Sequence, residues 1–405
     1  MKKAFTKNIK IVFILRFLRH FAFMGGIFNL FLIERGFGIA DLAIYFTLRR
    51  MAQMFFEIPV GYIINIIGRK RGLQLSRLSI LGAFTILAVT DNYAIMMVAA
   101  VLDGLCNAFY SDTDTSLIYD ELKQKRQEKL YSRLLARYNL VGMIAFSIAS
   151  IIGATLANHF YSHSLIFTFY MTIPVYITHI ILTNKIKETV NISQRSKNML
   201  LSPFNIFSTG FKNIVGNKNL LKVVYFSSIL FAFHLIVWDY WQNYGQIIEL
   251  PLYIFGWIAF IFSMAEAGPQ FISHRFFKPK NFTKLYIVVS VMVFTLGLGS
   301  SILANHLGLA LLIGATIITG FSFPISDAIF HYHIKSKDRN ILCSFNRLIQ
   351  MMTYTICTLF FGVISDRYSI FAGLAFISSL VLMATIIYTT IHFLKPKKYR
   401  YKFAR

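Results

Sequence analysis

Residues 93–122 read YAIMMVAAVLDGLCNAFYSDTDTSLIYDEL, an almost wholly apolar segment that leads directly into four carboxylates. A helix needs about 20 consecutive apolar residues to cross the ~30 Å hydrocarbon core of a bilayer. Stretches of this kind recur along all 405 residues, of which 56% are hydrophobic and only 14% are charged. The composition therefore predicts an all-α polytopic membrane protein.

Hydropathy predicts twelve transmembrane helices. Their approximate ranges are 11–33, 42–65, 72–90, 93–119, 131–157, 164–184, 219–247, 252–274, 283–304, 307–332, 341–364 and 369–394. Lys and Arg collect in cytoplasmic loops. With the N-terminus inside, 31 of the 41 basic residues fall in cytoplasmic segments and only Arg35 and Arg367 on the other side. We therefore expect both termini in the cytoplasm. Most of the net charge of +24 then lies in cytoplasmic segments that face anionic lipid headgroups, and no nucleic-acid partner is needed to account for it.

The longest polar segment, residues 184–219, divides the predicted spans into two sets of six. We expect an N-terminal six-helix bundle over 1–184, a cytoplasmic linker over 185–218, and a C-terminal six-helix bundle with a basic tail over 219–405. The halves show weak similarity at an offset of about 209 residues, which aligns Glu57 with Glu266. Two similar halves are typical of secondary transporters whose substrate binds between them.

The segment GYIINIIGRKRG (61–72) resembles the signature loop between spans two and three of the major facilitator superfamily. Gly61, Gly68, Arg69 and Lys70 match that signature, and Asn65 stands where Asp is usual. FEIPVGYI (56–63) and SDTDTSLIYDEL (111–122) are similar to motifs of a bacterial subgroup. The resemblance implies two six-helix bundles, transport by alternating access, and a multi-pass protein of the bacterial inner membrane. We expect a monomer.

Two motifs of that superfamily are missing. The antiporter signature of the fifth span is absent from LVGMIAFSIASIIGATLA (140–157), and the fourth-span arginine of many proton-linked members is absent from VAAVLDGLCNAF (98–109).

Polar residues follow one narrow stripe of the predicted fourth span: Asp103, Asn107, Ser111 and Asp114. Asp103 lies about 15 Å from the outer end of that span. An ionisable group at this depth normally pairs or lines a wet cavity. The stripe predicts a cavity face with titratable carboxylates at Asp103 and Asp114, or else a structural ion pair with a neighbouring helix.

Arg19 and His20 lie about 12–15 Å deep in the predicted first span. Spans one and four line the central cavity in the superfamily, so the resemblance implies an Arg19–Asp103 pair or contact of Arg19 with substrate. His20 could titrate near neutral pH or be a packing residue. On the second span, Arg50 and Glu57 share a face and favour an internally neutralised ladder.

In the second half, FAFHLIVWDYWQNYGQ (231–246) places His234, Trp238 and Trp241 on one side of a helix, with Asp239 toward the outer half. Aromatic rings beside a carboxylate suit a large planar or cationic ligand. An aromatic belt at the membrane interface would give the same pattern. Symmetry with Glu57 already explains Glu266.

Several residues near the cytoplasmic side are candidates for gating. The resemblance assigns Asp120 to an inner gate. Arg137 and Arg347 occupy similar places in the two halves, and we expect them to pair with Asp120 and Asp327 respectively.

The sequence has no P-loop, no Cys or His metal cluster and no nucleophile elbow. We therefore expect neither an enzyme nor a cofactor nor a metal site, and ion gradients remain as the energy source. The reading we favour is proton-linked export, by antiport, of a lipophilic or amphipathic small molecule such as a drug or toxic metabolite. One alternative is proton-linked uptake of a small nutrient that could be anionic, using Arg19, Arg49 or Arg50. Another is a transporter-like sensor or assembly protein that binds partners through residues 184–219 or the basic tail.

Overall fold

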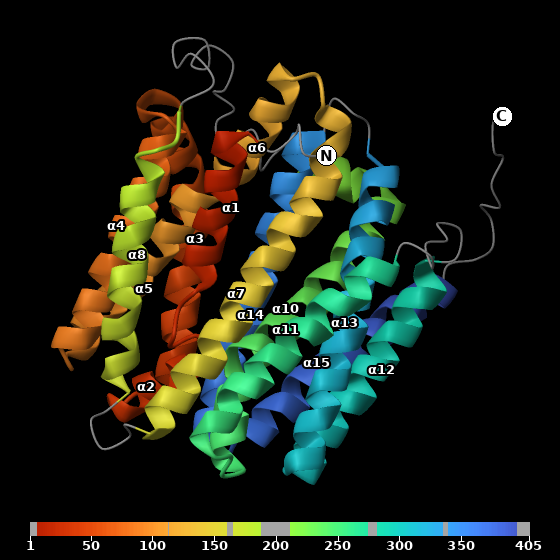
Figure 1. Cartoon of the computed structure of the whole chain (residues 1–405). Helices are drawn as coiled ribbons and strands as arrows, with labels where there is room; N and C mark the ends of the chain where they lie inside the picture. Colours follow the sequence, from red (N-terminus) through yellow and green to blue (C-terminus); the bar gives the residue numbers. More distant parts are fainter. Residues whose placement is uncertain are drawn as a thin grey trace.

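A computed structural model describes residues 6–111, 113–159, 165–187, 211–273, 282–334 and 339–394. Helices account for most of these residues, and the described part of the chain contains no strand (Figure 1). The prediction of an all-α protein is confirmed. Most of the expected linker, residues 188–210, and the basic tail from residue 395 lie outside the described residues.

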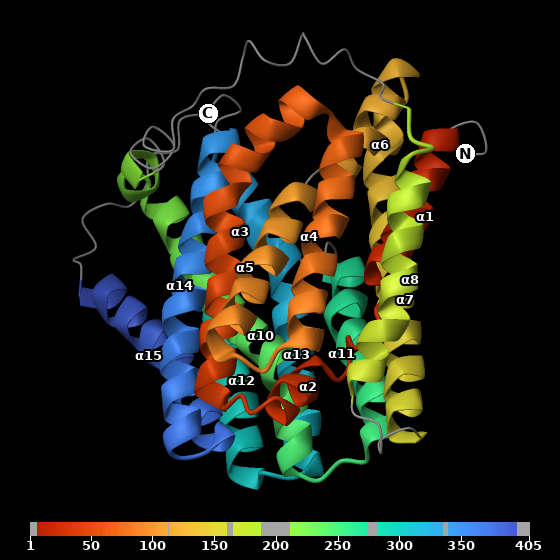
Figure 2. The same cartoon turned by 90° about the vertical axis from the view of Figure 1, so that its left-hand side faces the viewer.

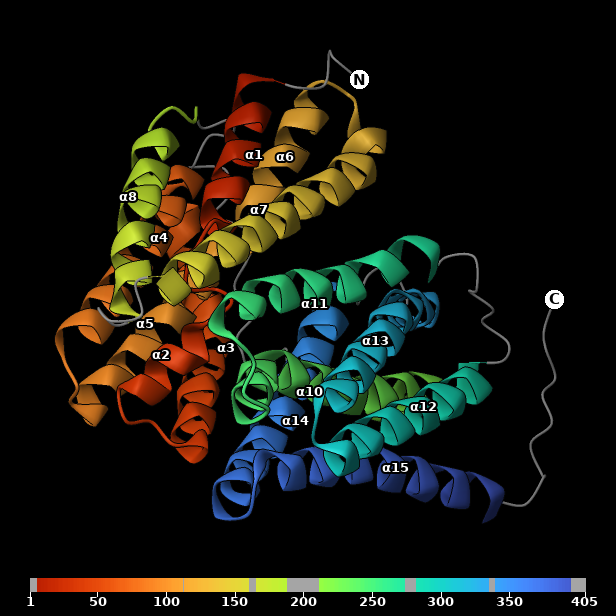
Figure 3. The ribbon, with the colours of Figure 1, turned by 60° about the horizontal axis from the view of Figure 1, so that its bottom comes forward.

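The helices form two groups that lie side by side (Figures 1 and 3). The first bundle contains α1 (Lys7–His20), α2 (Phe28–Glu34), α3 (Ile39–Ile67), α4 (Arg69–Val89), α5 (Tyr93–Tyr110), α6 (Thr113–Gln124), α7 (Tyr131–His159) and α8 (Ile166–Thr183). The second bundle contains α10 (Lys218–Ile247), α11 (Leu252–Ser273), α12 (Phe282–Leu303), α13 (His306–Tyr332), α14 (Arg339–Arg367) and α15 (Ile370–Leu394).

Ten helical segments of the described residues are long and apolar enough to cross a membrane. They coincide with ten of the twelve predicted spans. The other two predicted spans correspond to α1 with α2, and to α3. Helices α1 and α2 are too short individually, with 14 and 7 residues. Helix α3 has 29 residues but carries four charged side chains. The count of twelve spans and the location of the termini stay predictions.

Two predicted spans are broken. The first is interrupted at residues 21–27, which include Gly25 and Gly26, and the fourth is interrupted after Tyr110, where Ser111 leaves the helical conformation. Non-helical backbone at membrane depth is tolerated only where protein or water satisfies its polar groups. Here Phe23 N donates to Thr172 Oγ1 at 3.2 Å, and Gly25 O accepts from Gln242 at 3.1 Å. The first break is thus stabilised by both bundles.

The molecule has two ends that carry different elements. The basic end carries the start of α1, the α3–α4 junction and α6; the opposite end carries α2 and the α10–α11 connection (Figures 1 and 2). The α3–α4 junction turns at Gly68, whose φ of 90° is a conformation that favours glycine. This explains why the signature loop needs Gly68.

The bundles meet along two helix pairs, α7 with α11 and α3 with α14 (Figure 2). Near the opposite end the approach is very close, because a Cβ on Gly256 would lie 2.5 Å from Ile151 Cα of α7. Toward the basic end, a Cβ on Gly61 or Gly268 would meet no described atom within 4 Å. The bundles are therefore in close contact near the opposite end, whereas Gly61 and Gly268 are exposed with open space beside them.

Candidate functional site

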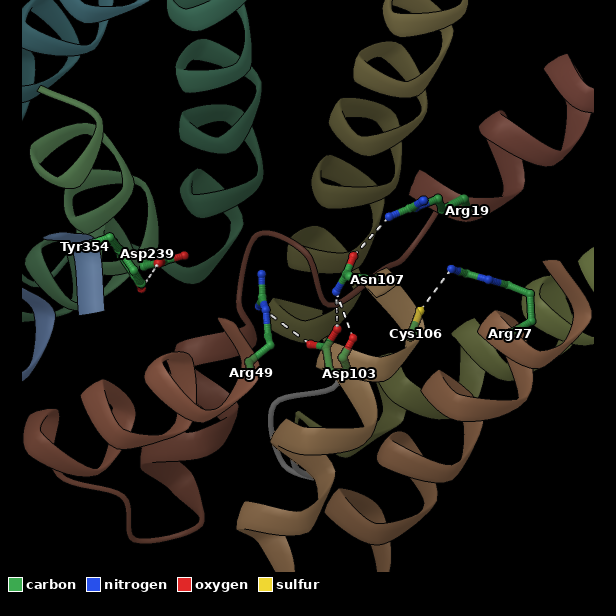
Figure 4. A network of polar contacts seen from close by, with 8 residues as sticks. All are labelled: Arg19, Arg49, Arg77, Asp103, Cys106, Asn107, Asp239 and Tyr354. Atoms are coloured by element: carbon green, nitrogen blue, oxygen red, sulfur yellow. Dashed lines mark hydrogen bonds and ion pairs between the residues drawn. The ribbon is translucent and has the colours of Figure 1, made fainter. Parts of the chain in front are cut away.

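A chain of polar contacts links α1, α5 and α3 (Figure 4). Arg19 donates to Asn107 Oδ1 at 3.0 Å, and Asn107 Nδ2 donates to Asp103 Oδ1 at 2.9 Å. The other oxygen of Asp103 lies 3.6 Å from Arg49 Nη1. Arg19 therefore reaches Asp103 only through Asn107, and Arg49 is the ion partner. Gly104 explains why Arg49 reaches Asp103. A Cβ on Gly104 would lie 2.7 Å from Ala52 Cβ, so α3 packs directly on this part of α5.

The Arg49–Asp103 pair is accessible, with side chains 21% and 16% exposed. From the second bundle, Tyr354 of α14 donates to Asp239 Oδ2 of α10 at 2.6 Å. Figure 4 shows this second pair facing the first from the other bundle. The guanidinium carbon of Arg50 lies 5.9 Å from the centre of the Tyr354 ring. The facing surfaces thus bring together two arginines and two carboxylates, which balances their charges.

A second ion pair joins the bundles nearer the basic end. Arg347 Nη1 lies 3.3 Å from Glu57 Oε1, and Ser111 Oγ donates to the same oxygen at 3.2 Å. The side chains of Arg347 and Glu57 are 56% and 34% exposed. This pair takes the place of the Arg50–Glu57 ladder expected from the sequence, whereas Arg347 also attracts the carboxylate of Asp327, its expected partner, without forming an ion pair with it among the described residues. The reason is tertiary: α3 lies along α14, which brings Glu57 to Arg347 across the interface.

The signature loop is tied to its own bundle. Arg69 Nη1 lies 2.5 Å from Asp120 Oδ2, and Lys70 Nζ donates to the carbonyl of Asn184 at 2.8 Å. One of the expected partners of Asp120, an arginine of the loop after span two, is therefore present. Asn65 and Arg137 are half-buried on α3 and α7.

In the second bundle, His234 bridges two helices. Its Nδ1 lies 2.8 Å from Thr319 Oγ1, and its Nε2 lies 3.8 Å from Glu266 Oε1. The Glu266 side chain is 29% exposed, whereas that of His234 is 4% exposed. Glu266 is thus a partner of a predicted site residue as well as the repeat counterpart of Glu57.

The two tryptophans of α10 do not flank the carboxylate of Asp239. Trp241 is 3% exposed and stacks on Phe262 at 5.4 Å between ring centres. Trp238 lies 6.0 Å from Phe146 of α7, so it packs where the bundles meet. The Asp239 carboxylate instead turns to Tyr354. The recorded ring contacts of the two tryptophans are therefore with other aromatic residues, and the recorded hydrogen bond of the Asp239 side chain is with Tyr354.

Buried amides close the opposite end. Asn29 of α2 donates through Nδ2 to Asp239 O at 2.5 Å and to Asn243 Oδ1 at 2.7 Å, and through its backbone N to Gln242 Oε1 at 2.9 Å. The three amide residues are at most 6% exposed. We call Asn29, Gln242 and Asn243 the amide clasp. It joins the first bundle to α10.

Sequence reasoning missed several residues of these networks, among them Asn29, Asn243, Arg77 and Tyr354. Arg77 is 2% exposed on α4, although it stands inside an otherwise apolar span. An arginine inside an apolar span is itself a signal that could have identified Arg77 from the sequence. Asn29 and Tyr354 gave none, because amides and tyrosines are common in such helices. Of the residues predicted on the first bundle, Asp114 is 3% exposed and His20 is half-buried, so neither matches the accessibility of the Glu57–Arg347 pair.

Comparison with known proteins adds the family. The sequence profile of the Major Facilitator Superfamily matches residues 12–349. The chain belongs to this superfamily. It is accordingly a multi-pass membrane transporter of the major facilitator type. Comparison with curated protein sequences gives no match.

Solved structures of other major facilitators share this fold. A point mutant of the nucleoside transporter NupG superposes with a TM-score of 0.78 at 12% identity, covering 95% of this chain and 98% of that one. A further NupG structure gives 0.73 at 15% identity, covering 98% and 100%. At these identities the likeness establishes the fold alone.

Proposed function

We propose that this major facilitator takes up a small polar solute through a site between its bundles, with protons as the coupling ion. The observation that carries the proposal is the Arg49–Asp103 pair, which is accessible and faces Asp239 and Tyr354 of the other bundle. Charged and hydroxyl groups bind polar solutes by hydrogen bonds and ion pairs. Nutrients of that kind do not cross a bilayer unaided.

Export of a lipophilic compound, the direction that the sequence favoured, has no support from the comparisons. The two similar solved structures are of a nucleoside transporter, which carries a polar solute. The buried, stacked position of Trp241 also weakens the case for an aromatic cation site. We therefore favour uptake. Nucleosides become the first compounds to test.

Alternating access requires a site that opens to one side at a time. The amide clasp and the close contact at Gly256 support a state that is closed at the opposite end. In this proposal the basic end faces the cytoplasm of a bacterial cell, so the structure is the inward-facing state. Uptake then needs the clasp to open and the Glu57–Arg347 side to close.

We assign proton coupling to Glu266 and His234. Glu266 is partly exposed between the bundles, and its carboxylate lies 3.8 Å from the buried imidazole. Protonation of Glu266 removes its attraction for a charged His234. It also changes the net charge of the surface that the second bundle presents to the solute.

The test is radiolabelled uptake into proteoliposomes with an inward proton gradient, using nucleosides, amino acids and organic acids. We expect one class to accumulate, and Arg49→Gln and Asp103→Asn to reduce accumulation at least tenfold. Arg71→Gln is the matched control, because Arg71 is exposed in the first turn of α4. Counterflow without a gradient separates binding from coupling. Failure of all three classes to accumulate, together with gradient-driven extrusion of a lipophilic dye, would refute the proposal.

A further inference from the structure

Three arginines lie inside the first bundle without a carboxylate partner. Arg77 of α4 donates to Cys106 Sγ at 3.2 Å. Arg19 donates to Asn107, and Arg16 donates to Asn139 Oδ1 at 3.3 Å. Among the described residues none of the three forms an ion pair. We call Arg16, Arg19 and Arg77 the arginine cluster.

The charge of the arginine cluster is not balanced by protein groups. Asp114, which is 3% exposed, is the carboxylate that attracts Arg16 and Arg19. Asp103 is already paired with Arg49. A guanidinium does not lose its proton in a protein. Uncompensated charge at membrane depth is energetically costly and is normally paired. Asp103 also attracts Arg77, so the three arginines of the cluster, together with Arg49, share two carboxylates.

Aromatic rings hold the guanidinium groups in place. The Cζ atoms of Arg19 and Arg77 lie 3.5 and 5.4 Å from the centre of the same ring, Tyr110. Arg77 also lies 5.1 Å from the Tyr176 ring, and Arg16 lies 4.7 Å from the Tyr138 ring. Figure 4 shows the head groups of Arg19 and Arg77 both directed at α5. Rings attract cations but supply no countercharge.

Buried nitrogens of the same region lack hydrogen-bond partners. They are Arg16 Nε, Arg77 Nε, His20 Nε2 and His179 Nε2, none of which has a partner among the described residues. Arg77 is 2% exposed and His179 is fully buried. Buried polar groups are nearly always paired, with protein, water or an ion. Both arginine Nε atoms can only donate.

We propose that the arginine cluster binds a small anion inside the first bundle, separate from the solute site at Arg49 and Asp103. The ligand class is a halide, a small carboxylate or inorganic phosphate. Such an ion accepts the free N–H groups and supplies the missing negative charge. It holds α1 against α4 and α5, the helices that carry Arg19, Arg77 and Asn107 in Figure 4.

Thermal unfolding of the purified full chain tests the site. Sodium gluconate is exchanged for chloride, formate or phosphate at constant ionic strength. Binding stabilises the folded state by RT ln(1 + [L]/Kd), so Tm rises with the logarithm of concentration above Kd and by roughly 3–6 °C at 100 times Kd. We expect at least one probe to give this response. Arg77→Gln and Arg19→Gln should lose it, and Arg71→Gln, which alters an exposed arginine, should keep it.

Two further measurements test anion binding if Arg77→Gln fails to fold. Equilibrium dialysis of the wild type with radioactive chloride, competed by formate and by phosphate, should give saturable binding. Arg77→Lys keeps the charge but loses the planar fork, so its affinity should fall at least tenfold.

Variants at the two sites show whether the anion binds at the arginine cluster or at the solute site. A response kept in Arg49→Gln and lost in Arg19→Gln shows a bound ion apart from the solute. A response lost in Arg49→Gln and kept in Arg19→Gln assigns the anion to the solute site and overturns the proposal. A wild type that responds equally to every salt, with no saturable chloride binding, also overturns it. Solute uptake is a separate readout, so failure of the transport proposal is recognised independently.

Discussion

The amide clasp gives the sharpest prediction about conformational change. Asn29→Ala removes the two side-chain hydrogen bonds to Asp239 O and Asn243 Oδ1, at 2.5 and 2.7 Å, which cross from one bundle to the other. Each is worth about 1 kcal/mol net. Both form only while the opposite end is closed. The substitution should therefore shift the equilibrium toward opening of this end by about 2 kcal/mol, or roughly 30-fold.

Distances between spin labels on the two bundles measure that shift. Val89 and Leu307 lie at the opposite end, one in each bundle, and are 79% and 67% exposed. Labels are attached there in a chain whose three cysteines are replaced by serine. In Asn29→Ala we expect a large fraction of the distribution to move to longer distances in double electron–electron resonance.

The matched control is Asn305→Ala. Asn305 caps α13 by accepting from Gly308 N at 3.1 Å, a bond that stays within the second bundle. Its removal costs about 1 kcal/mol of helix stability but should leave the distance distribution unchanged. A folded Asn29→Ala protein whose distribution matches both the wild type and this control would refute the role of the clasp.

Three further predictions concern packing, the exposed ion pair and coupling. Gly256→Val should abolish transport, because the new side chain would collide with the α7 backbone. Gly268→Val, on the same helix with open space beside it, should be tolerated, and uptake and size-exclusion profiles check both variants. Removing the half-exposed pair by Glu57→Gln with Arg347→Gln should change Tm little, since such pairs contribute about 0–1 kcal/mol, and a double-mutant cycle on uptake rates should still show coupling. His234→Gln should lose gradient-driven accumulation but keep counterflow, and equal loss of both would contradict its assignment to coupling.

Helix positions were predictable from the sequence because the membrane selects for apolar length. Ten predicted spans coincide with ten apolar helices of the structure. The breaks in the first and fourth spans were not predicted. Gly25 and Gly26 are compatible with a helix in lipid. The break is stable only because other residues, such as Thr172, form hydrogen bonds with the backbone groups that it frees.

Polar residues that share a helix face could be predicted from the sequence, but their pairings could not. Helical spacing shows that Asp103 and Asn107 share a face. It does not show which neighbouring helix that face meets. The short distance between α3 and α5 at Gly104 made Arg49 the partner of Asp103, and the crossing of α3 with α14 made Glu57 the partner of Arg347. Both outcomes depend on contacts between segments far apart in the chain.

The polarity of α1 and α3 has a consequence for how the protein is made. Neither is among the segments apolar enough to cross a membrane alone, yet both precede the ten that are. An arginine at a helix centre opposes insertion by about 2.5–3.5 kcal/mol on the translocon scale. Asp103 and Asn107, the partners of Arg49 and Arg19, emerge from the ribosome only with α5. Biogenesis must therefore retain the first two spans beside the insertion machinery until α5 arrives. A nascent chain stalled before residue 93 should be extractable by alkaline carbonate, and one stalled far enough beyond residue 124 for α5 to have left the ribosome should resist extraction.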